Sequence, residues 1–275
     1  MMKLRAFVQR FLPSALQPTL RSFASSLHSA NWRHRCSVCE QKVERFLPLD
    51  PYYEEQWRRH GYQPVAERDE TCNLEAYSCP FCGSPDRDRL SALYLHERLG
   101  RNTGGPKISL VDFAPAPALS AHVRRNYHIT YRTADLNMPG VDDHVDLACM
   151  DLYADRSFDA FICSHVLEHV SDDLRAMAEL HRILKPGGWG LAMVPIPLGD
   201  HGIREDPSQT SEADRWRSFG QSDHVRIYSR TAFVSRLESV GFEVRALDRR
   251  HFGSHRLHFY GIADTAVLYV AEKVK

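Results

Sequence analysis

The sequence predicts an α/β protein: a doubly wound, mostly parallel sheet of seven strands, preceded by a small cysteine-containing module. The first reason is that apolar runs typical of strands alternate with amphipathic stretches from residue 107 onward, the pattern of parallel strands joined by helices. The second is that four of the seven cysteines form two Cys-x-x-Cys pairs between residues 36 and 82. A chain of 275 residues is long enough for one large domain and a small module.

We expect three parts along the chain: a basic N-terminal extension (1–35), a zinc-ribbon-like module (36–85) and the main α/β domain (86–275). In the main domain, strands are predicted at 108–113, 129–134, 145–150, 159–163, 189–194, 242–247 and 266–271. Helices are predicted at 86–100, 117–125, 172–184 and 229–240. Ser171 is expected to cap the third helix, with Leu174 on its buried face.

The charge pattern separates the N-terminal extension from the rest. Residues 1–35 contain six basic residues and no acid, whereas the remainder has 29 basic and 35 acidic residues. Apolar side chains at helical spacing in residues 4–12 are consistent with a short helix in weak contact with an anionic membrane surface. They are also consistent with a loose terminus or a helix on its own domain, the interpretation that the usual looseness of termini favours, and the composition also resembles a transit peptide. The acidic remainder makes a nucleic-acid partner unfavourable.

Composition excludes a membrane-spanning protein and a disulfide framework. The central apolar run, residues 191–198, has eight residues and two prolines. A membrane helix needs about 20. Seven cysteines, an odd number with paired spacing, indicate metal binding in a reducing compartment. We therefore expect a cytoplasmic protein.

The cysteine pairs predict a structural zinc site. Cys36 and Cys39 form one pair and Cys79 and Cys82 the other, and each spacing lets both thiolates reach one tetrahedral ion. The 39 residues between the pairs are more than a zinc ribbon usually has, but loop entropy grows slowly with length. Four thiolates fill the coordination shell of zinc, so the site should not be catalytic.

The other cysteines are weaker candidates. Cys72 lies in the same segment and is a spare or substitute ligand. Cys149 and Cys163 fall on predicted strands and are expected in the core.

An ordered set of motifs resembles the class I S-adenosylmethionine-dependent methyltransferases over about residues 107–272. The motifs are Asp112-Phe-Ala-Pro-Ala-Pro-Ala118, SFD at 157–159, HVLEH at 165–169 and LKPGG at 184–188. In the first motif, Asp112 stands at the acid position of acid-x-Gly-x-Gly-x-Gly, and Ala114, Ala116 and Ala118 replace the glycines. The alanines keep the small size but lose the glycines' freedom to adopt positive φ.

The resemblance implies a Rossmann-like fold that binds S-adenosylmethionine at the carboxyl ends of the strands. The methionine end would lie over the turn at 113–116, the ribose on Asp135, and the adenine near Asp151 rather than Asp146. The implied cofactor contacts are Asp112, Phe113, Ala114, Pro115, Ala116, Asp135, Leu136, Asp151, Leu152, Ser164 and His165.

The cysteine pairs, the LYL-containing helix, the FAP turn and the segment FGQSDHVRIYS at 219–229 narrow the resemblance further. Together they are similar to a bacterial subgroup of methyltransferase type 11-like proteins. Such proteins often have sugar or envelope settings, which implies a small-molecule or saccharide-like acceptor.

Candidate catalytic residues follow the fourth predicted strand and the later insert: His165, Glu168, His169 and His224. A histidine of near-neutral pKa can remove a proton from an acceptor, and Glu168 can orient it. His224, Arg226 and Tyr228 are expected to line the acceptor side, where the arginine suits a carboxylate or phosphate.

Two alternatives stay open at this point. One is a zinc-containing RNA methyltransferase, which the basic extension favours. The other is an inactive scaffold of methyltransferase fold, which the missing glycines favour and the acids at 112, 135 and 151 oppose. The acceptor, the methylated atom and the oligomeric state do not follow from the sequence.

Overall fold

The structure is a computed structural model, and it describes residues 33–63, 69–100, 107–199 and 202–274. The amphipathic segment of the N-terminal extension, with its possible membrane contact, lies outside these residues. The strands are β1 (His34–Arg35), β2 (Lys42–Val43), β3 (Ile108–Phe113), β4 (Ile129–Asp135), β5 (Asp143–His144), β6 (Phe158–Ser164), β7 (Leu184–Met193), β8 (Arg204–Glu205), β9 (Arg226–Ile227), β10 (Phe242–Leu247) and β11 (Leu268–Lys273). The helices are α3 (Pro51–His60), α4 (Asp86–Leu99), α5 (Pro117–Asn126), the short 3-10 helix η2 (Leu167–His169), α6 (Asp173–Ile183), α7 (Glu212–Phe219), α8 (Arg230–Ser239), α9 (Arg249–Phe252) and α10 (Ser254–Phe259).

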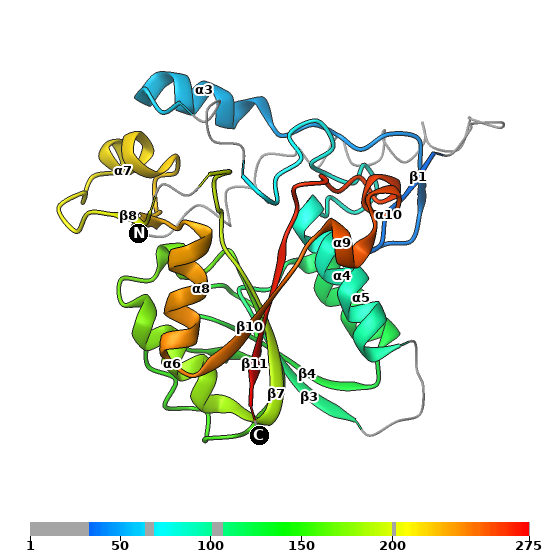
Figure 1. Cartoon of the computed structure of the whole chain (residues 1–275), viewed down its shortest axis with the longest axis vertical. Helices are drawn as coiled ribbons and strands as arrows, with labels where there is room; N and C mark the ends of the chain where they lie inside the picture. The colour runs from blue at the N-terminus through cyan, green and yellow to red at the C-terminus, as the bar shows by residue number, and fades with distance from the viewer. Residues whose placement is uncertain (1–32, 64–68, 101–106, 200–201, 275) are drawn as a thin grey trace.

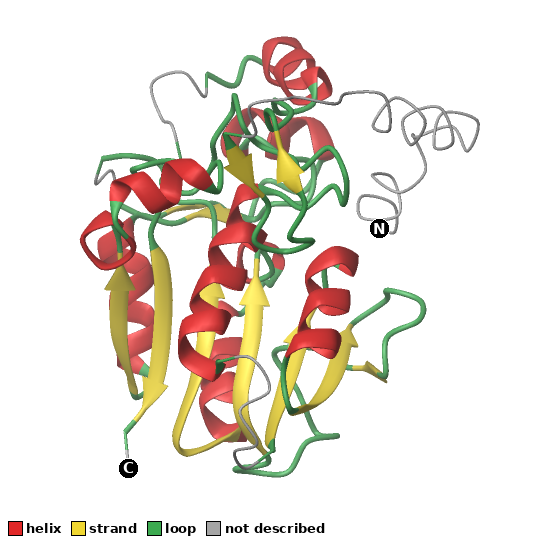
Figure 2. Cartoon of the chain, turned by 90° about the vertical axis from the view of Figure 1, so that its right-hand side faces the viewer, coloured by secondary structure: helices red, strands yellow, loops and turns green. Residues whose placement is uncertain are grey.

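Seven strands form one sheet, as predicted, in the order β10-β11-β7-β6-β3-β4-β5 (Figure 2). β11 is antiparallel to both of its neighbours, and the other pairs from β7 to β5 are parallel. From the central β3 the chain moves outward to β4 and β5, and then returns to β6 and β7 on the other side. The strand order therefore reverses between β3 and β6, which is where an open α/β sheet binds ligands.

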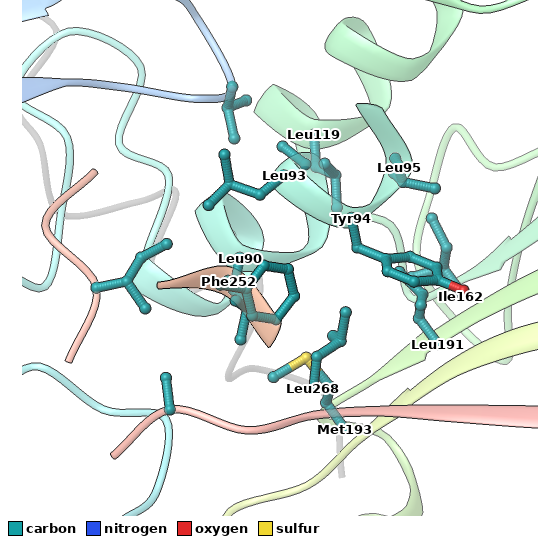
Figure 3. Packing of buried hydrophobic residues seen from close by; sticks show 14 of the residues in the cluster. Leu90, Leu93, Tyr94, Leu95, Leu119, Ile162, Leu191, Met193, Phe252 and Leu268 are labelled. Atoms are coloured by element: carbon teal, nitrogen blue, oxygen red, sulfur yellow. The ribbon is translucent and has the colours of Figure 1, made fainter. Parts of the chain in front are cut away.

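Helices cover both faces of the sheet, with α6 and α8 on one side and α4 and α5 on the other (Figure 1). Successive strand residues point to opposite faces, so each face has its own core. Leu110 and Ile162 join the core under α4, while Val111 and Phe161 join the core under α6. Figure 3 shows the first core, where side chains of α4 and α5 pack against those of β6, β7 and β11.

α6 begins later than predicted. Asp172 rather than Ser171 is the N-cap, and its carboxylate accepts a hydrogen bond from the N–H of Arg175. The positive N-terminal end of the helix dipole also stabilises a carboxylate at this position. The buried residues of the helix follow helical spacing from Asp173, which leaves Leu174 beside the stripe and 42% exposed, so the prediction for Leu174 was wrong.

The prediction of a strand at 145–150 is also wrong. The third strand of the seven-stranded sheet in chain order is β5, Asp143–His144. The segment after it forms turns. Its apolar side chains are nevertheless buried: Val145, Leu147 and Met150. Their pattern therefore indicates burial, not extended backbone. By contrast, β3 and β10 have the predicted bounds. The LKPGG segment at 184–188, which lies between the predicted helix at 172–184 and the predicted strand at 189–194, forms the start of β7.

The cysteine-containing segment packs into the core under α4. Cys36, Val38, Val43, Phe46 and Cys79 belong to the same buried cluster as the apolar residues of α4 and β7. The segment therefore shares its hydrophobic core with the sheet domain.

Two helices that the sequence did not predict, α3 and α7, pack against each other (Figure 1). The indole N–H of Trp57 donates to the carbonyl of Gly220 at 2.9 Å, and the His60 ring stacks on Trp216 with 5.6 Å between centroids. No residue of α3 is buried, and most of its side chains are polar or charged. Within the described residues, no helix is long and apolar enough to cross a membrane.

Candidate functional site

Two residues with strained backbone mark the carboxyl ends of β3 and β6. Ala114 directly follows β3 with φ 51°, and His165 directly follows β6 with φ 56°. In the described part of the chain, only Glu40 and Arg156 are other non-glycine residues with positive φ. This conformation costs about 1–2 kcal/mol per residue, and strain of this kind gathers at functional sites.

The turn after β3 is held against the neighbouring strand. The N–H of Ala114 donates to the carbonyl of Ala134 at 2.8 Å, and Pro117 starts α5 at a position where a proline loses no helical hydrogen bond. Ala116 has an ordinary φ of −79°, so only the first alanine of the motif adopts the conformation that glycine prefers. The N-terminus of α5 lies at this edge, where unpaired N–H groups favour a negative charge.

Asp112 and Phe113 lie beneath this turn and are buried. The carboxylate of Asp112 accepts a hydrogen bond from the Tyr131 hydroxyl at 2.5 Å, and this hydroxyl also lies 2.8 Å from that of Ser120. Asp112 therefore links β3, β4 and α5 and supports the turn from below.

Asp135 ends β4 at the same edge of the sheet. Its Oδ1 accepts the N–H groups of Asn137 at 2.8 Å and Met138 at 2.7 Å, which fixes the loop that follows. Next to it, Leu136 is 57% exposed, a large apolar side chain in contact with solvent.

Asp151 and Leu152 form a similar pair in the loop after β5. Asp151 is exposed, and Leu152 is 62% exposed. Asp146, the less favoured acid, accepts the N–H of Ala148 at 2.8 Å and closes its own turn. Each of the two acids chosen for the cofactor thus precedes an exposed leucine.

A buried carboxylate surrounded by three histidines follows β6. The Oε1 atom of Glu168 lies 3.3 Å from His165 Nδ1, 3.9 Å from His169 Nε2 and 4.0 Å from His224 Nε2. Glu168 is 1% exposed and His169 is 33% exposed. The structure therefore brings together all four predicted catalytic residues, three from the segment after β6 and one from the later insert.

The electrostatics of this cluster favour an ionised carboxylate. Burial alone raises the pKa of Glu168, but the contact with His165 and the electrostatic influence of the neighbouring imidazoles lower it to about 2. Burial and the neighbouring His169 lower the pKa of His224 to about 3. At neutral pH, Glu168 is thus an anion and His224 an uncharged imidazole.

Arg226 and Tyr228 hold this cluster in place from behind. The guanidinium of Arg226 donates to the carbonyls of Leu167 at 2.9 Å and Ser171 at 2.8 Å, as well as to that of Val170. The fully buried Tyr228 donates to Asp173 at 2.5 Å. We therefore do not retain Arg226 and Tyr228 as acceptor contacts, because their polar groups are directed at the protein itself.

Two further residues support the site, and sequence reasoning did not select them. Asp223 Oδ2 lies 3.5 Å from His169 Nδ1, and the carboxylate of Glu205 lies 3.1 Å from Arg226 Nε. The position of Asp223 next to His224 in the sequence was an available signal. Glu205 offered none, since its partner lies 21 residues away.

The four predicted cysteine ligands converge. Their sulfur atoms all lie within 4.8 Å of one another, with Cys36–Cys82 at 3.8 Å and Cys39–Cys79 at 3.7 Å. Tetrahedral Zn–S bonds of about 2.3 Å would separate the sulfurs by about 3.8 Å. The donor set and its spacing therefore fit one structural zinc ion.

The remaining cysteines are not part of that cluster. Cys72 is outside it, and burial raises the pKa of its thiol, which favours the neutral form. Cys163 is buried as expected, but Cys149 is exposed, so its prediction as a core residue was wrong. Cys149 lies in a turn because the expected strand at 145–150 does not form.

Comparison with solved structures finds distant resemblances. The chain is 12% identical to the CurJ carbon methyltransferase (TM-score 0.45), with 68% of this chain and 54% of that chain covered, so it spans about half that protein's length. It is 17% identical to the [4+2]-cyclase SpnF (TM-score 0.47; 83% and 99% covered). It is 15% identical to the 1,6-didemethyltoxoflavin-N1-methyltransferase of Burkholderia thailandensis (TM-score 0.43; 68% and 78% covered), solved with S-adenosylhomocysteine. A search of curated proteins found no match.

The sequence profile of a methyltransferase-domain family matches residues 86–247. This range is more than half of the chain, and it contains α4, the strands β3 to β7 and the cluster around Glu168. Its co-substrate, as the family implies, is S-adenosylmethionine. The chain belongs to the methyltransferase-domain family, and it is a class I S-adenosylmethionine-dependent methyltransferase.

Proposed function

We propose that this methyltransferase acts on a small-molecule or saccharide-like acceptor that binds beside His165. The observation that supports this most is the position of His165, which directly follows β6 with its Nδ1 3.3 Å from the ionised Glu168. A negative carboxylate at Nδ1 favours the tautomer with its proton there. Nε2 is then the basic nitrogen of the ring.

His165 would act as the general base. S-adenosylmethionine supplies an activated methyl group, so the protein has to align an acceptor oxygen or nitrogen and remove its proton. His165 Nε2 would take that proton, and Glu168 would stabilise the imidazolium that forms. His224 is unsuited to this role, because burial lowers its pKa to about 3.

For the cofactor, we propose that Asp135 accepts the ribose hydroxyls. Both of its hydrogen bonds to the loop end on Oδ1, which leaves Oδ2 for a diol. Leu136 and Leu152 would enclose the adenine, and Asp151 would accept from its amino group. The exposure of the two leucines supports this, since an adenine would cover apolar surface that water now contacts.

We also propose that the four cysteines hold zinc. The chain would then consist of an N-terminal extension (1–35), a zinc-binding module (36–85) and the methyltransferase domain (86–275). The odd number and paired spacing of the cysteines support a reducing, cytoplasmic setting. A nucleic-acid acceptor is disfavoured, since residues 36–275 have six more acidic than basic residues.

The test is a calorimetric titration of zinc-replete protein with S-adenosylmethionine and S-adenosylhomocysteine. We expect Asp135→Asn to weaken binding at least about tenfold, because a hydrogen bond to a charged group contributes about 1.5–3 kcal/mol. Asp146→Asn is the matched control, an acid at the same edge that closes its own turn, and it should leave affinity unchanged. Equal losses in both variants would contradict the assignment, as would absence of binding by folded protein at millimolar cofactor.

A further inference from the structure

Glu168 poses a problem that the general-base proposal does not solve. Neither Oε1 nor Oε2 has a hydrogen-bond partner within the described residues, although the side chain is almost completely buried. The nearest cationic partner is His165, whose Nδ1 lies at an ion-pair distance of 3.3 Å from Oε1. An unsatisfied buried carboxylate is costly and calls for a cation.

Two imidazole nitrogens converge on the same carboxylate. His169 Nε2 and His224 Nε2 lie 3.9 and 4.0 Å from Glu168 Oε1, and the three ligand atoms all lie within 4.8 Å of one another. A tetrahedral zinc ion with bonds of about 2.0–2.1 Å separates its ligand atoms by about 3.4 Å. The two separations from the carboxylate would therefore have to shorten by about 0.5 Å, and the separation of the two nitrogens, at most 4.8 Å, by up to about 1.4 Å.

Both histidines have further contacts of the kind that support metal ligands. His169 Nδ1 lies 3.5 Å from the carboxylate of Asp223 and 3.3 Å from its backbone carbonyl. The ring of His224 hydrogen-bonds to the backbone of Phe219. Such outer contacts fix the ring orientation and leave the other nitrogen for the metal.

We propose that Glu168, His169 and His224 bind a divalent transition-metal ion such as Zn2+. Two imidazoles and one carboxylate suit zinc and similar ions, and three protein ligands leave a position open. His169 is only partly buried, which gives the ion a route from solvent. An oxygen of the acceptor would occupy the open position beside His165. That last step rests on the proposed function, whereas binding of the ion does not.

The experiment measures zinc directly in the full-length protein. Protein is treated with a mild chelator that spares the four-cysteine site, then titrated with Zn2+ by calorimetry, and its zinc content is measured by mass spectrometry. We expect the wild type to take up one ion more per chain than His169→Asn. Loss of a ligand should weaken binding more than about 100-fold, because outer partners alone contribute about 10–100-fold.

Matched variants separate the metal site from the proposed base. Asp223→Asn should weaken zinc about tenfold through its contact with His169. His165→Asn should keep the ion, as should His144→Asn, at an exposed histidine of β5. Cobalt in place of zinc gives an independent readout, since thiolate-to-cobalt absorption reports only the cysteine site. His169 is partly exposed, so its variant should fold, which a thermal melt checks.

Equal zinc uptake and affinity in the wild type and His169→Asn would overturn the proposal. So would a wild-type protein that holds only the ion of the four-cysteine site. Neither result would affect cofactor binding by Asp135, so failure here is distinguishable from failure of the proposed function.

Discussion

Arg89 connects distant parts of the chain through a single buried side chain. Its guanidinium donates five hydrogen bonds at 2.5–3.0 Å to the carbonyls of Ala76, Tyr77, Ser84, Tyr260 and Gly261. It also lies 4.0 Å from the centroid of the Phe46 ring. Its partners are carbonyl dipoles, and the negative charge nearest in the sequence is Asp88. A zinc ion bound by four thiolates carries a net negative charge, which would help to balance this cation.

We expect Arg89→Lys to lower the free energy of unfolding by about 3–5 kcal/mol, because an ammonium cannot reproduce the planar fork and leaves buried carbonyls unpaired. Urea unfolding measures the change. Arg98→Lys is the control: its side chain is 40% exposed and 3.7 Å from Glu272, so the effect should stay below about 0.5 kcal/mol. A similar small change in both variants would show that Arg89 is dispensable.

Ala114 and Ala116 should respond oppositely to glycine. With φ 51°, Ala114→Gly relieves strain of about 1 kcal/mol and should raise the stability or leave it unchanged. With φ −79°, Ala116→Gly gains nothing in the folded state and should lose about 0.5–1 kcal/mol. Differential scanning calorimetry of the pair checks the sign. A loss of stability in Ala114→Gly as large as in Ala116→Gly would contradict the strained turn.

At the scale of elements, the apolar pattern predicted the core strands correctly. It failed where buried residues do not have an extended backbone. β3 and β10 have the bounds expected from their apolar runs, but residues 145–150 are buried in turns. Short polar helices such as α3, α7, α9 and α10 were not predicted, because tertiary contacts stabilise them more than their own periodicity does. An example is Glu97 of α4, which binds His251 at 3.0 Å.

The candidate site was also predictable only in part, because some of its residues are brought together by tertiary contacts that leave no local pattern in the sequence. Asp135 at the end of β4 and Glu168 after β6 could be selected, because strand ends and motif order point to them. The convergence of His224 on Glu168 depends on a hydrogen bond from Val225 N–H to the Glu168 carbonyl at 2.9 Å, across 57 residues. No periodic pattern in the sequence indicates that contact.

The buried Asp86 at the start of α4 should make the free energy of unfolding depend on pH. Burial raises the pKa of Asp86 to about 6, despite hydrogen bonds from the N–H groups of Asn73 and Arg87. The folded protein then binds this proton more tightly than the unfolded chain, so stability falls as the pH rises from about 4 to about 6. Asp86→Asn should remove up to about 3 kcal/mol of that dependence. Urea unfolding at several pH values tests this, and parallel pH profiles for the two proteins would contradict it.

At the scale of the whole molecule, the shared core couples the cysteine site to the sheet. Cys36 and Cys79 belong to the same buried cluster as the side chains of α4 and β7. We therefore expect Cys39→Ser to lower the midpoint of the main thermal transition, because zinc binding is coupled to folding. Cys149→Ser, at an exposed cysteine, should have no effect. Two separate transitions, with the larger one unchanged, would instead indicate an independent module.

The position of β11 also has a consequence for synthesis of the chain. β11 lies between β10 and β7, so a growing chain that has emerged through β10 still has an open edge on β7. Arg89 likewise emerges 171 and 172 residues before the Tyr260 and Gly261 carbonyls that satisfy it. From the emergence of β7 until that of β11, the ribosome-bound chain exposes a strand edge of the kind that promotes association. Closure of the sheet and burial of Arg89 are therefore late, nearly simultaneous events, and chaperone demand should be greatest just before them.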